Sequence, residues 1–246
     1  MGKNYEAPEV EIAEIKELDL KEPLVIAGFV GAGLVGSIAV GHIINQLKME
    51  EIAYMKSKYI PPVAIFVEEK LRHPFRIHAS KKYNLCAIIC EVPLREDGFY
   101  SISSAILDWA ESKGIKEILV LEGLPVPGLP IERKSFCVTE SGKCEPFKEK
   151  GIDMLKKGII VGISGAILNE CLTRKIEGTS LLTTAMTTIP DPEGAAILIE
   201  ALNKSYGFKI DTSELIEGAN EIREKLKEIA ESYEKTAVAE PERMYA

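Results

Sequence analysis

The sequence predicts an α/β fold, a three-layer sandwich in which helices flank a mixed, largely parallel sheet. Two observations support this prediction. Apolar runs rich in β-branched residues recur along the chain, and helically spaced apolar residues separate several of them. Strands that alternate with helices form parallel or mixed sheets that are covered on both faces. The runs are 23–29 (PLVIAGF), 63–68 (VAIFVE), 85–92 (LCAIICEV), 117–123 (EILVLEG) and 158–164 (GIIVGIS).

The composition fits one large domain. The chain has 246 residues, of which 46% are hydrophobic, so it can bury a large core. We expect a single α/β domain over residues 1–236 and a flexible C-terminal tail over residues 237–246, because the tail has little to bury. A net charge of -8 disfavours nucleic acid as a partner. No apolar run reaches membrane-spanning length and no signal peptide is recognisable, so we expect a cytoplasmic protein without a membrane partner.

The first apolar run leads into GFVGAGLVGSIAVGH (28–42), whose glycines Gly31, Gly33 and Gly36 have G-x-G-x-x-G spacing. In a dinucleotide-binding loop such glycines allow a tight turn, the approach of the pyrophosphate and close helix packing. The acidic residue that would bind the ribose is missing about twenty positions later. That region reads YMKSKY, whose lysines would suit only a 2′-phosphate. We therefore favour an architectural role, in which small residues let a helix over 34–47 pack closely on the sheet, and keep nucleotide binding as the alternative.

Two segments between the strands carry turn signals. Three prolines and two glycines in EGLPVPGLP (122–130) predict a loop at the end of a strand, where α/β sheets line their ligand crevices. FCVTESGKCEPF (136–147) predicts a β-hairpin with Gly142 in its turn. Cys137 and Cys144 bracket this turn, so either a cross-strand disulfide or two unpaired small residues fit the pattern.

Catalytic and metal-binding signatures are thin in the sequence, and none of its many carboxylates forms a recognisable pair. It contains neither the G-x-x-x-x-G-K-S/T phosphate loop nor the G-x-S-x-G nucleophile elbow. His42 lies in an apolar helical segment and is expected in the core. His73 and His78 are expected on opposite faces of a strand, without a cluster of further ligands. We therefore predict no catalytic, cofactor-binding or metal-binding residues and no enzyme activity.

Two helices are predicted near the C-terminus. In IPDPEGAAILIEALNKSYG (189–207), Asp191 is placed to cap a helix that starts at Pro192 and stops at Gly207. Asp211 then starts a last helix over 212–233. Apolar residues form a heptad seam along it: Leu215, Ala219, Ile222, Leu226, Ile229 and Tyr233. The seam fits packing either on the protein's own sheet or on the same helix of a second subunit.

Four segments in order resemble the proteasome-assembly-chaperone family and its archaeal homologues: GFVGAGLVGSIA (28–39), EGLP (122–125), GISGAIL (162–168) and IPDPEGAA (189–196). The resemblance spans residues 10 to 235, although Val30 stands where many members carry proline. It implies a fold related to the nucleoside-phosphorylase-like folds, with no catalytic residues to assign.

Given this resemblance, the last three residues, Met244, Tyr245 and Ala246, gain meaning. They match the hydrophobic-Tyr-any motif by which proteasome regulators dock between α subunits of the core particle. A terminal carboxylate, an aromatic ring with a polar tip and an adaptable thioether suit such a pocket. The resemblance thus implies a homo-oligomeric protein that binds the proteasome core particle as an assembly chaperone or an ATP-independent activator. The alternatives are an ordinary frayed terminus, a chaperone subunit that works only with a different partner chain, or a small-molecule or nucleotide-binding enzyme. Such an enzyme would use the crevice formed by Gly31–Gly36, EGLPVPGLP (122–130) and GISG (162–165).

Overall fold

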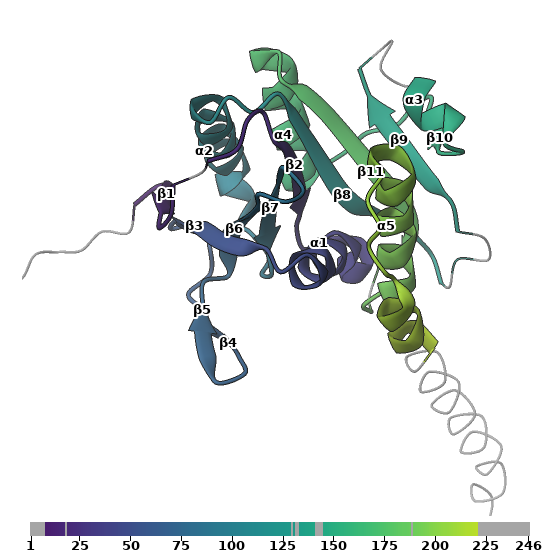
Figure 1. Ribbon diagram of the computed structural model, residues 1–246, viewed down its shortest axis with the longest axis horizontal. Coiled ribbons are helices and arrows are strands. Elements are labelled where there is room, and N and C mark those ends of the chain that lie inside the picture. The colour runs from purple at the N-terminus through teal and green to yellow at the C-terminus, as the bar shows by residue number, and fades with distance from the viewer. Residues whose placement is uncertain are drawn as a thin grey trace, which may run out of the picture.

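The computed structural model describes residues 8–17, 19–128, 130, 133–140, 145–187 and 189–220 (Figure 1). The strands are β1 (Glu11–Glu14), β2 (Leu24–Gly28), β3 (Glu50–Lys56), β4 (Ile65–Val67), β5 (Lys70–Arg72), β6 (Phe75–Ser80), β7 (Leu85–Cys90), β8 (Glu117–Val126), β9 (Ser135–Thr139), β10 (Asp153–Met154) and β11 (Glu177–Met186). The helices are η1 (Ala32–Leu34), α1 (Val35–Gln46), η2 (Glu96–Gly98), α2 (Phe99–Ser112), α3 (Glu145–Glu149), α4 (Gly162–Arg174) and α5 (Pro192–Tyr206). Residues 213–220 are also helical.

Nine of the described strands form one sheet in the order β1-β3-β6-β7-β2-β8-β11-β9-β10. Its centre is parallel, because β7, β2, β8 and β11 all run in the same direction. Antiparallel pairs flank this centre, with β6 beside β7 and β9 beside β11. The predicted α/β fold with a mixed, largely parallel sheet is therefore confirmed.

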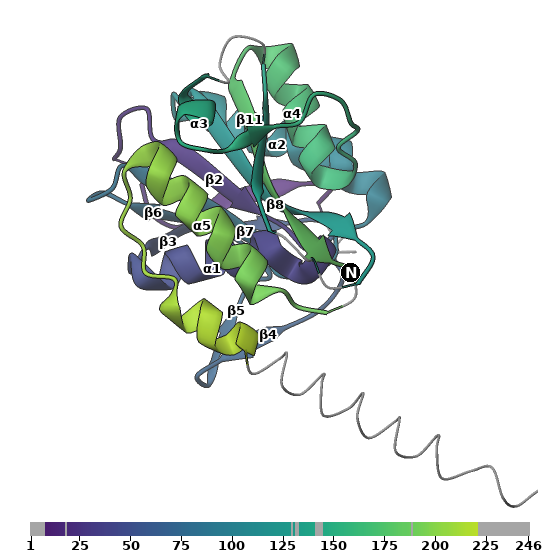
Figure 2. The same ribbon diagram turned by 90° about the vertical axis from the view of Figure 1, so that its right-hand side faces the viewer.

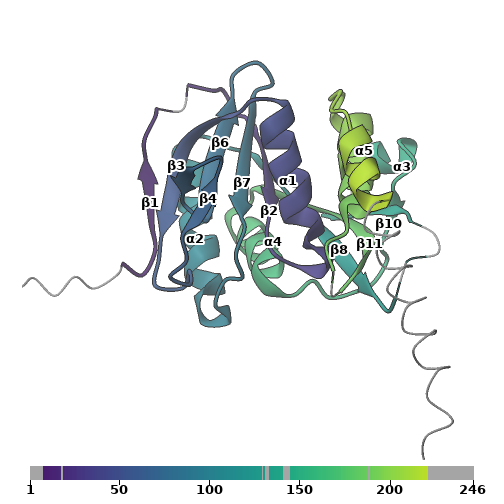
Figure 3. The same ribbon diagram turned by 90° about the horizontal axis from the view of Figure 1, so that it is seen from below.

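Helices cover both faces of the sheet (Figure 2, Figure 3). α1 and α5 pack side by side on one face, and α2 and α4 pack together on the other. Each face has its own apolar core because side chains alternate along the strands. On β8, Leu119 belongs to the core beneath α1 and α5, whereas Ile118 and Val120 belong to the core beneath α2 and α4.

Four predicted segments are wrong in type or extent. Residues 158–161 form no strand, and the run continues into α4 instead. The run 63–68 yields only β4, which pairs with β5 in a separate hairpin outside the main sheet. Residues 136–147 do not form a hairpin, because β9 pairs with the distant β11 and Glu145–Glu149 is helical. The predicted loop 122–130 starts as strand up to Val126.

The extension of β8 has a simple reason. β2 pairs with β8 only as far as Leu121, so among the described strands β11 alone pairs with the stretch from Glu122 to Val126. Proline is tolerated where one side of a strand has no partner, and Pro125 lies in this stretch. β8 therefore continues through Pro125 to Val126, although a proline would interrupt a strand that is paired on both sides.

The predicted ends of α5 are confirmed. Asp191 Oδ1 accepts a hydrogen bond from the Gly194 N–H at 3.1 Å, Pro192 is the first helical residue, and Gly207 ends the helix with φ of 74°. At the start of the next helix, Asp211 Oδ1 accepts a hydrogen bond from the Ser213 N–H at 3.1 Å.

Only the first part of the predicted 212–233 helix is described. Its seam residue Leu215 packs against the core beneath α5, and Ala219 is buried. The seam therefore begins on the protein's own core, whereas its members from Ile222 onward lie outside the described residues. Among the described helices, none is both long and apolar enough to cross a membrane.

Candidate functional site

The glycine loop places the start of α1 directly on the sheet. A Cβ atom on Gly28 would lie 2.2 Å from the Gly36 carbonyl oxygen, and one on Gly36 would lie 2.1 Å from the Leu121 carbonyl oxygen. At Gly123 a Cβ would lie 2.3 Å from the Ala32 carbonyl oxygen. These separations are too short for any side chain, so the glycines allow α1 to approach β2 and β8 closely. This geometry agrees with the architectural role predicted for the loop.

The second glycine of the fingerprint faces protein. Gly33 has φ of 61° and is buried, and a Cβ there would lie 2.8 Å from Cβ of Asp191. Its carbonyl oxygen accepts a hydrogen bond from the Asp191 N–H at 2.8 Å. The turn before α5 thus occupies the side of Gly33 on which a dinucleotide site needs room for pyrophosphate. In contrast, a Cβ on Gly31 would meet no atom within 4 Å.

A cavity of about 500 Å³ opens beside Gly31 at the carboxyl ends of β2, β7 and β8. Its walls come from residues 29–32, 92–94, 121–125 and 159–164, with Phe99, Leu182 and Thr187. The predicted crevice between the glycine loop, EGLP and GISG is therefore present. Most of the lining side chains are apolar, and none of the residues assigned to its walls is a lysine, arginine or histidine.

Among the described residues that line the cavity, Glu122 carries the one ionisable side chain. It is half-buried on the side of β8 that faces α4. The Ser180 hydroxyl donates to its Oε1 at 3.0 Å, and the Ser164 hydroxyl is a second hydrogen-bond partner. Burial raises the pKa of Glu122 above its ordinary value, which the two hydroxyls partly counteract. The sequence reasoning did not single out Glu122, although a carboxylate directly after the apolar run ILVL was a usable signal.

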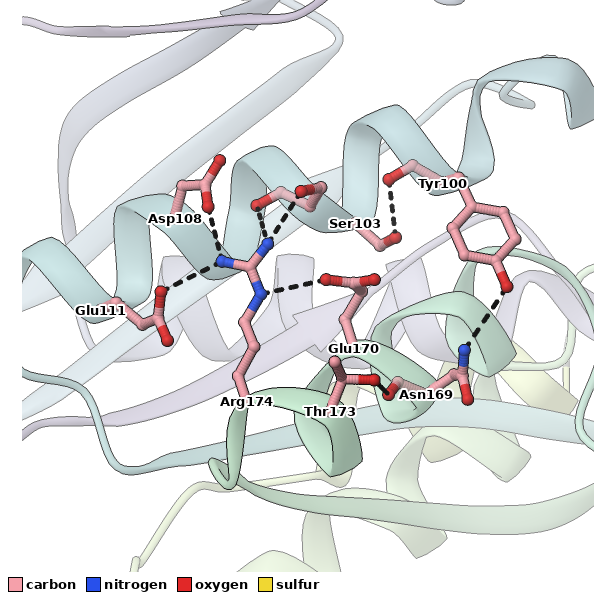
Figure 4. A network of polar contacts seen from close by, with 9 residues as sticks. Tyr100, Ser103, Asp108, Glu111, Asn169, Glu170, Thr173 and Arg174 are labelled. Carbon is pink, nitrogen blue, oxygen red and sulfur yellow. Dashed lines mark hydrogen bonds and ion pairs between the residues drawn. The ribbon is translucent and has the colours of Figure 1, made fainter.

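α4, which supplies one wall of the cavity, is anchored to α2 at its far end (Figure 4). The Arg174 guanidinium contacts Asp108 and Glu111 of α2 at 2.5 and 3.1 Å, and Glu170 of α4 at 3.0 Å. Its Nη2 also donates to the Ser104 hydroxyl at 2.8 Å. This planar group with several donors fixes the two helices relative to each other.

The three histidines, which we expected not to bind metal, lie in three different environments. His42 is buried, with Nε2 2.7 Å from the Asp211 carbonyl oxygen, as expected for a core histidine. The His73 ring stacks on Tyr54, with ring centroids 3.8 Å apart. His78 is buried, and burial lowers its pKa from 6.5 to about 4. Within the described part of the chain, no three His, Cys, Asp or Glu side chains group together as metal ligands.

Three of the described cysteines are buried thiols with raised pKa values. Burial raises the pKa of Cys86, Cys90 and Cys171 to about 12, so these thiols stay protonated at neutral pH. Cys137 is buried on β9, but Cys144 lies outside the described residues, so their pairing stays a prediction.

The predicted docking residues Met244, Tyr245 and Ala246 also lie outside the described residues. The structure therefore describes the crevice that an enzyme would use, but not the C-terminal residues proposed to dock on the proteasome.

Comparisons with known proteins agree on one family. The model of the PAC2 family matches residues 25–230. A Thermoplasma acidophilum protein of unknown function is 41% identical, with 91% of this chain and 92% of that chain covered and a TM-score of 0.75. Pyrococcus furiosus PbaA, an archaeal homolog of proteasome-assembly chaperone, is 25% identical, with 94% and 95% covered and a TM-score of 0.83. Pyrococcus furiosus PbaB, an archaeal proteasome activator, shares the fold at 24% identity, with 90% and 99% covered and a TM-score of 0.81.

Proposed function

This chain belongs to the PAC2 family, and on that premise we propose that it binds the proteasome core particle through Met244, Tyr245 and Ala246. It acts there as an assembly chaperone or as an activator that does not use ATP. The observation that carries the proposal is the likeness to PbaA over 94% of this chain. The absence of a phosphate-loop motif from the sequence supports the ATP-independent form.

The tail has suitable chemistry and reach. The ten residues 237–246 can span up to about 33 Å when extended, which is enough to leave the domain and enter a pocket. In the pocket the terminal carboxylate pairs with a lysine, the Tyr245 ring packs on apolar atoms, and Met244 fills the remaining gap. One short peptide binds weakly, so we propose that a homo-oligomer formed through helix 212–233 presents several tails at once. Because Leu215 and Ala219 pack on the protein's own core, the seam residues from Ile222 onward are the proposed subunit contact.

Removal of residues 244–246 tests this proposal. We expect the truncated protein no longer to capture the core particle. It should also no longer alter the rate at which the core particle hydrolyses short peptides. A second variant appends two serines after Ala246, which keeps all three side chains but displaces the terminal carboxylate. It should lose binding as well, because the proposed contact with a lysine needs that carboxylate. Unchanged capture and an unchanged peptidase rate after truncation would contradict the proposal.

The alternative function, a small-molecule or nucleotide-binding enzyme, relies on the cavity beside Gly31. Among the described residues, the walls of this cavity contain the carboxylate of Glu122 and no cationic side chain, which disfavours phosphate. The geometry thus favours the form of this alternative in which the ligand is not a nucleotide. Titration with NADPH and nucleosides distinguishes the two forms. Saturable binding of either, abolished by Gly31→Val in the cavity wall, would favour the nucleotide form.

A further inference from the structure

The cavity beside Gly31 is a feature that docking through a C-terminal tail does not use. Three sequence segments far apart in the chain, 28–39, 122–125 and 162–168, converge on it. Its volume of about 500 Å³ lies within the range of small-molecule sites. The carboxyl ends of parallel strands are also where α/β proteins place their ligands.

The chemistry of the walls selects the ligand. Aliphatic and aromatic side chains dominate them, and Glu122 is the one charged residue among the described lining residues. The Ser180 hydroxyl donates to its Oε1 at 3.0 Å, which holds the carboxylate as a hydrogen-bond acceptor. A carboxylate has about four lone-pair positions, so it can accept further donors from a ligand.

We propose that this cavity binds a small molecule with an apolar body and a protonated amine, and that Glu122 is the anchor for the amine. A ligand that covers Glu122 removes its remaining water, which is unfavourable unless the ligand brings donors and positive charge. An anionic ligand would be repelled by Glu122, and none of the described lining residues is a cation that could offset its charge. A neutral alcohol would supply one donor but no charge.

The mouth of the cavity fits the apolar part of this ligand. Ile159 and Val161 line it from the segment before α4, and they are 90% and 76% exposed. Large exposed apolar side chains beside a cavity are typical of surfaces that a ligand covers. Across the cavity Gly31 is extended and open, so ligand atoms can approach its backbone.

The experiment is isothermal titration calorimetry of the full chain with three amines: benzylamine, 2-phenylethylamine and 3-phenylpropylamine. The matched alcohols and carboxylates serve as uncharged and anionic controls. We expect saturable binding of at least one amine, about tenfold or more tighter than its alcohol, and no saturable binding of the carboxylates. No proteasome is present in this assay, so its outcome is independent of the proposed docking function.

Two variants locate the site. Glu122→Gln keeps the shape of the side chain and should weaken amine binding about tenfold or more. Gly31→Val places a branched side chain in the open space and should abolish binding without a clash at Cβ. Glu149→Gln, on the exposed surface of α3, is the matched control and should bind like the unmodified chain.

Three results would overturn the proposal: no amine binds saturably, alcohols or carboxylates bind as tightly as amines, or both cavity variants retain full affinity. Circular dichroism of each variant confirms that it is folded. If Glu122→Gln does not fold, Gly31→Val locates the ligand in the cavity, and the preference for amines over the matched alcohols and carboxylates decides the role of the charge.

Discussion

Arg133 and Asp191 form a buried ion pair, with Nη1 and Oδ2 2.8 Å apart and side chains only 8% and 2% exposed. Arg133 precedes β9, and Asp191 precedes α5. The other carboxylate oxygen of Asp191 caps α5. The backbone N–H of Asp191 donates to the carbonyl oxygen of Gly33. One aspartate therefore connects the entry to β9, the start of α5 and the glycine loop beside the cavity.

Replacement of Asp191 by alanine should lower the free energy of unfolding by about 2–4 kcal/mol, because it removes both the cap of α5 and a hydrogen bond between charged groups. The Arg133 guanidinium keeps Glu193 as a second partner, with Nε and Oε2 2.9 Å apart. Asp191→Asn keeps a cap for α5 and should lose less, since a helix cap contributes about 1 kcal/mol. Urea denaturation followed by circular dichroism measures both. Asp19→Ala, which removes an exposed pair with Lys81, is the control and should change little. Equal effects of Asp191→Ala and Asp19→Ala would disprove a structural role for the buried pair.

The glycine loop gives a second prediction. Gly36→Ala should destabilise the protein by more than about 3 kcal/mol or prevent folding, because its Cβ would lie 2.1 Å from a backbone oxygen that cannot move away easily. Gly31→Ala is the matched control and should change the unfolding free energy by less than about 1 kcal/mol, since its backbone is extended and the space is open. Thermal unfolding compares the two. A tolerated Gly36→Ala would contradict the architectural role of the loop.

Local sequence signals predicted several parts of this fold correctly. The cap at Asp191, the proline at 192 and the glycine at 207 fixed both ends of α5, because each acts through its own backbone chemistry. The helix after the glycine loop was predicted over 34–47 and runs from Val35 to Gln46. Such signals depend on a few neighbouring residues, so they can be interpreted without knowledge of the tertiary structure.

Where tertiary context decides, the sequence was misleading. The run 158–161 has the β-branched composition of a buried strand, but periodicity cannot distinguish a short apolar run in a strand from one at a cavity mouth. Ile159 is 90% exposed there. β9 pairs with β11, about forty residues away in the sequence, and not with an adjacent strand in a hairpin. The convergence of Glu122 with the hydroxyls of Ser164 and Ser180 likewise depends on three separate elements.

His78 should make the protein less stable in mild acid. Its pKa is about 4 in the folded protein, against an ordinary value of 6.5, because burial and the nearby Arg76 and Arg72 oppose its protonation. Above pH 6.5 both states are neutral at this residue; as the pH falls toward 4, only the unfolded state binds the proton, so the free energy of unfolding decreases. The loss reaches about 3 kcal/mol near pH 4.

Urea denaturation at a series of pH values tests this prediction in the unmodified chain and in His78→Leu. Leucine has no titrating group, so the variant should lose less stability between pH 6.5 and 4. The difference between the two profiles isolates His78 from the carboxylates that also titrate in acid. Parallel profiles would show that His78 is protonated equally in both states.

The contact between α2 and α4 should depend on the shape of the Arg174 side chain as well as its charge. Arg174→Lys keeps the charge but cannot contact Asp108, Glu111 and Glu170 with one planar group, so it should recover little of the stability lost in Arg174→Ala. We expect Arg174→Ala to lower the free energy of unfolding by about 1–2 kcal/mol, since Asp108 and Glu111 are largely exposed and water screens their charges. Hydrogen exchange of amides in α2 and α4 should increase in both variants. Full rescue by lysine would mean that charge alone holds the two helices together.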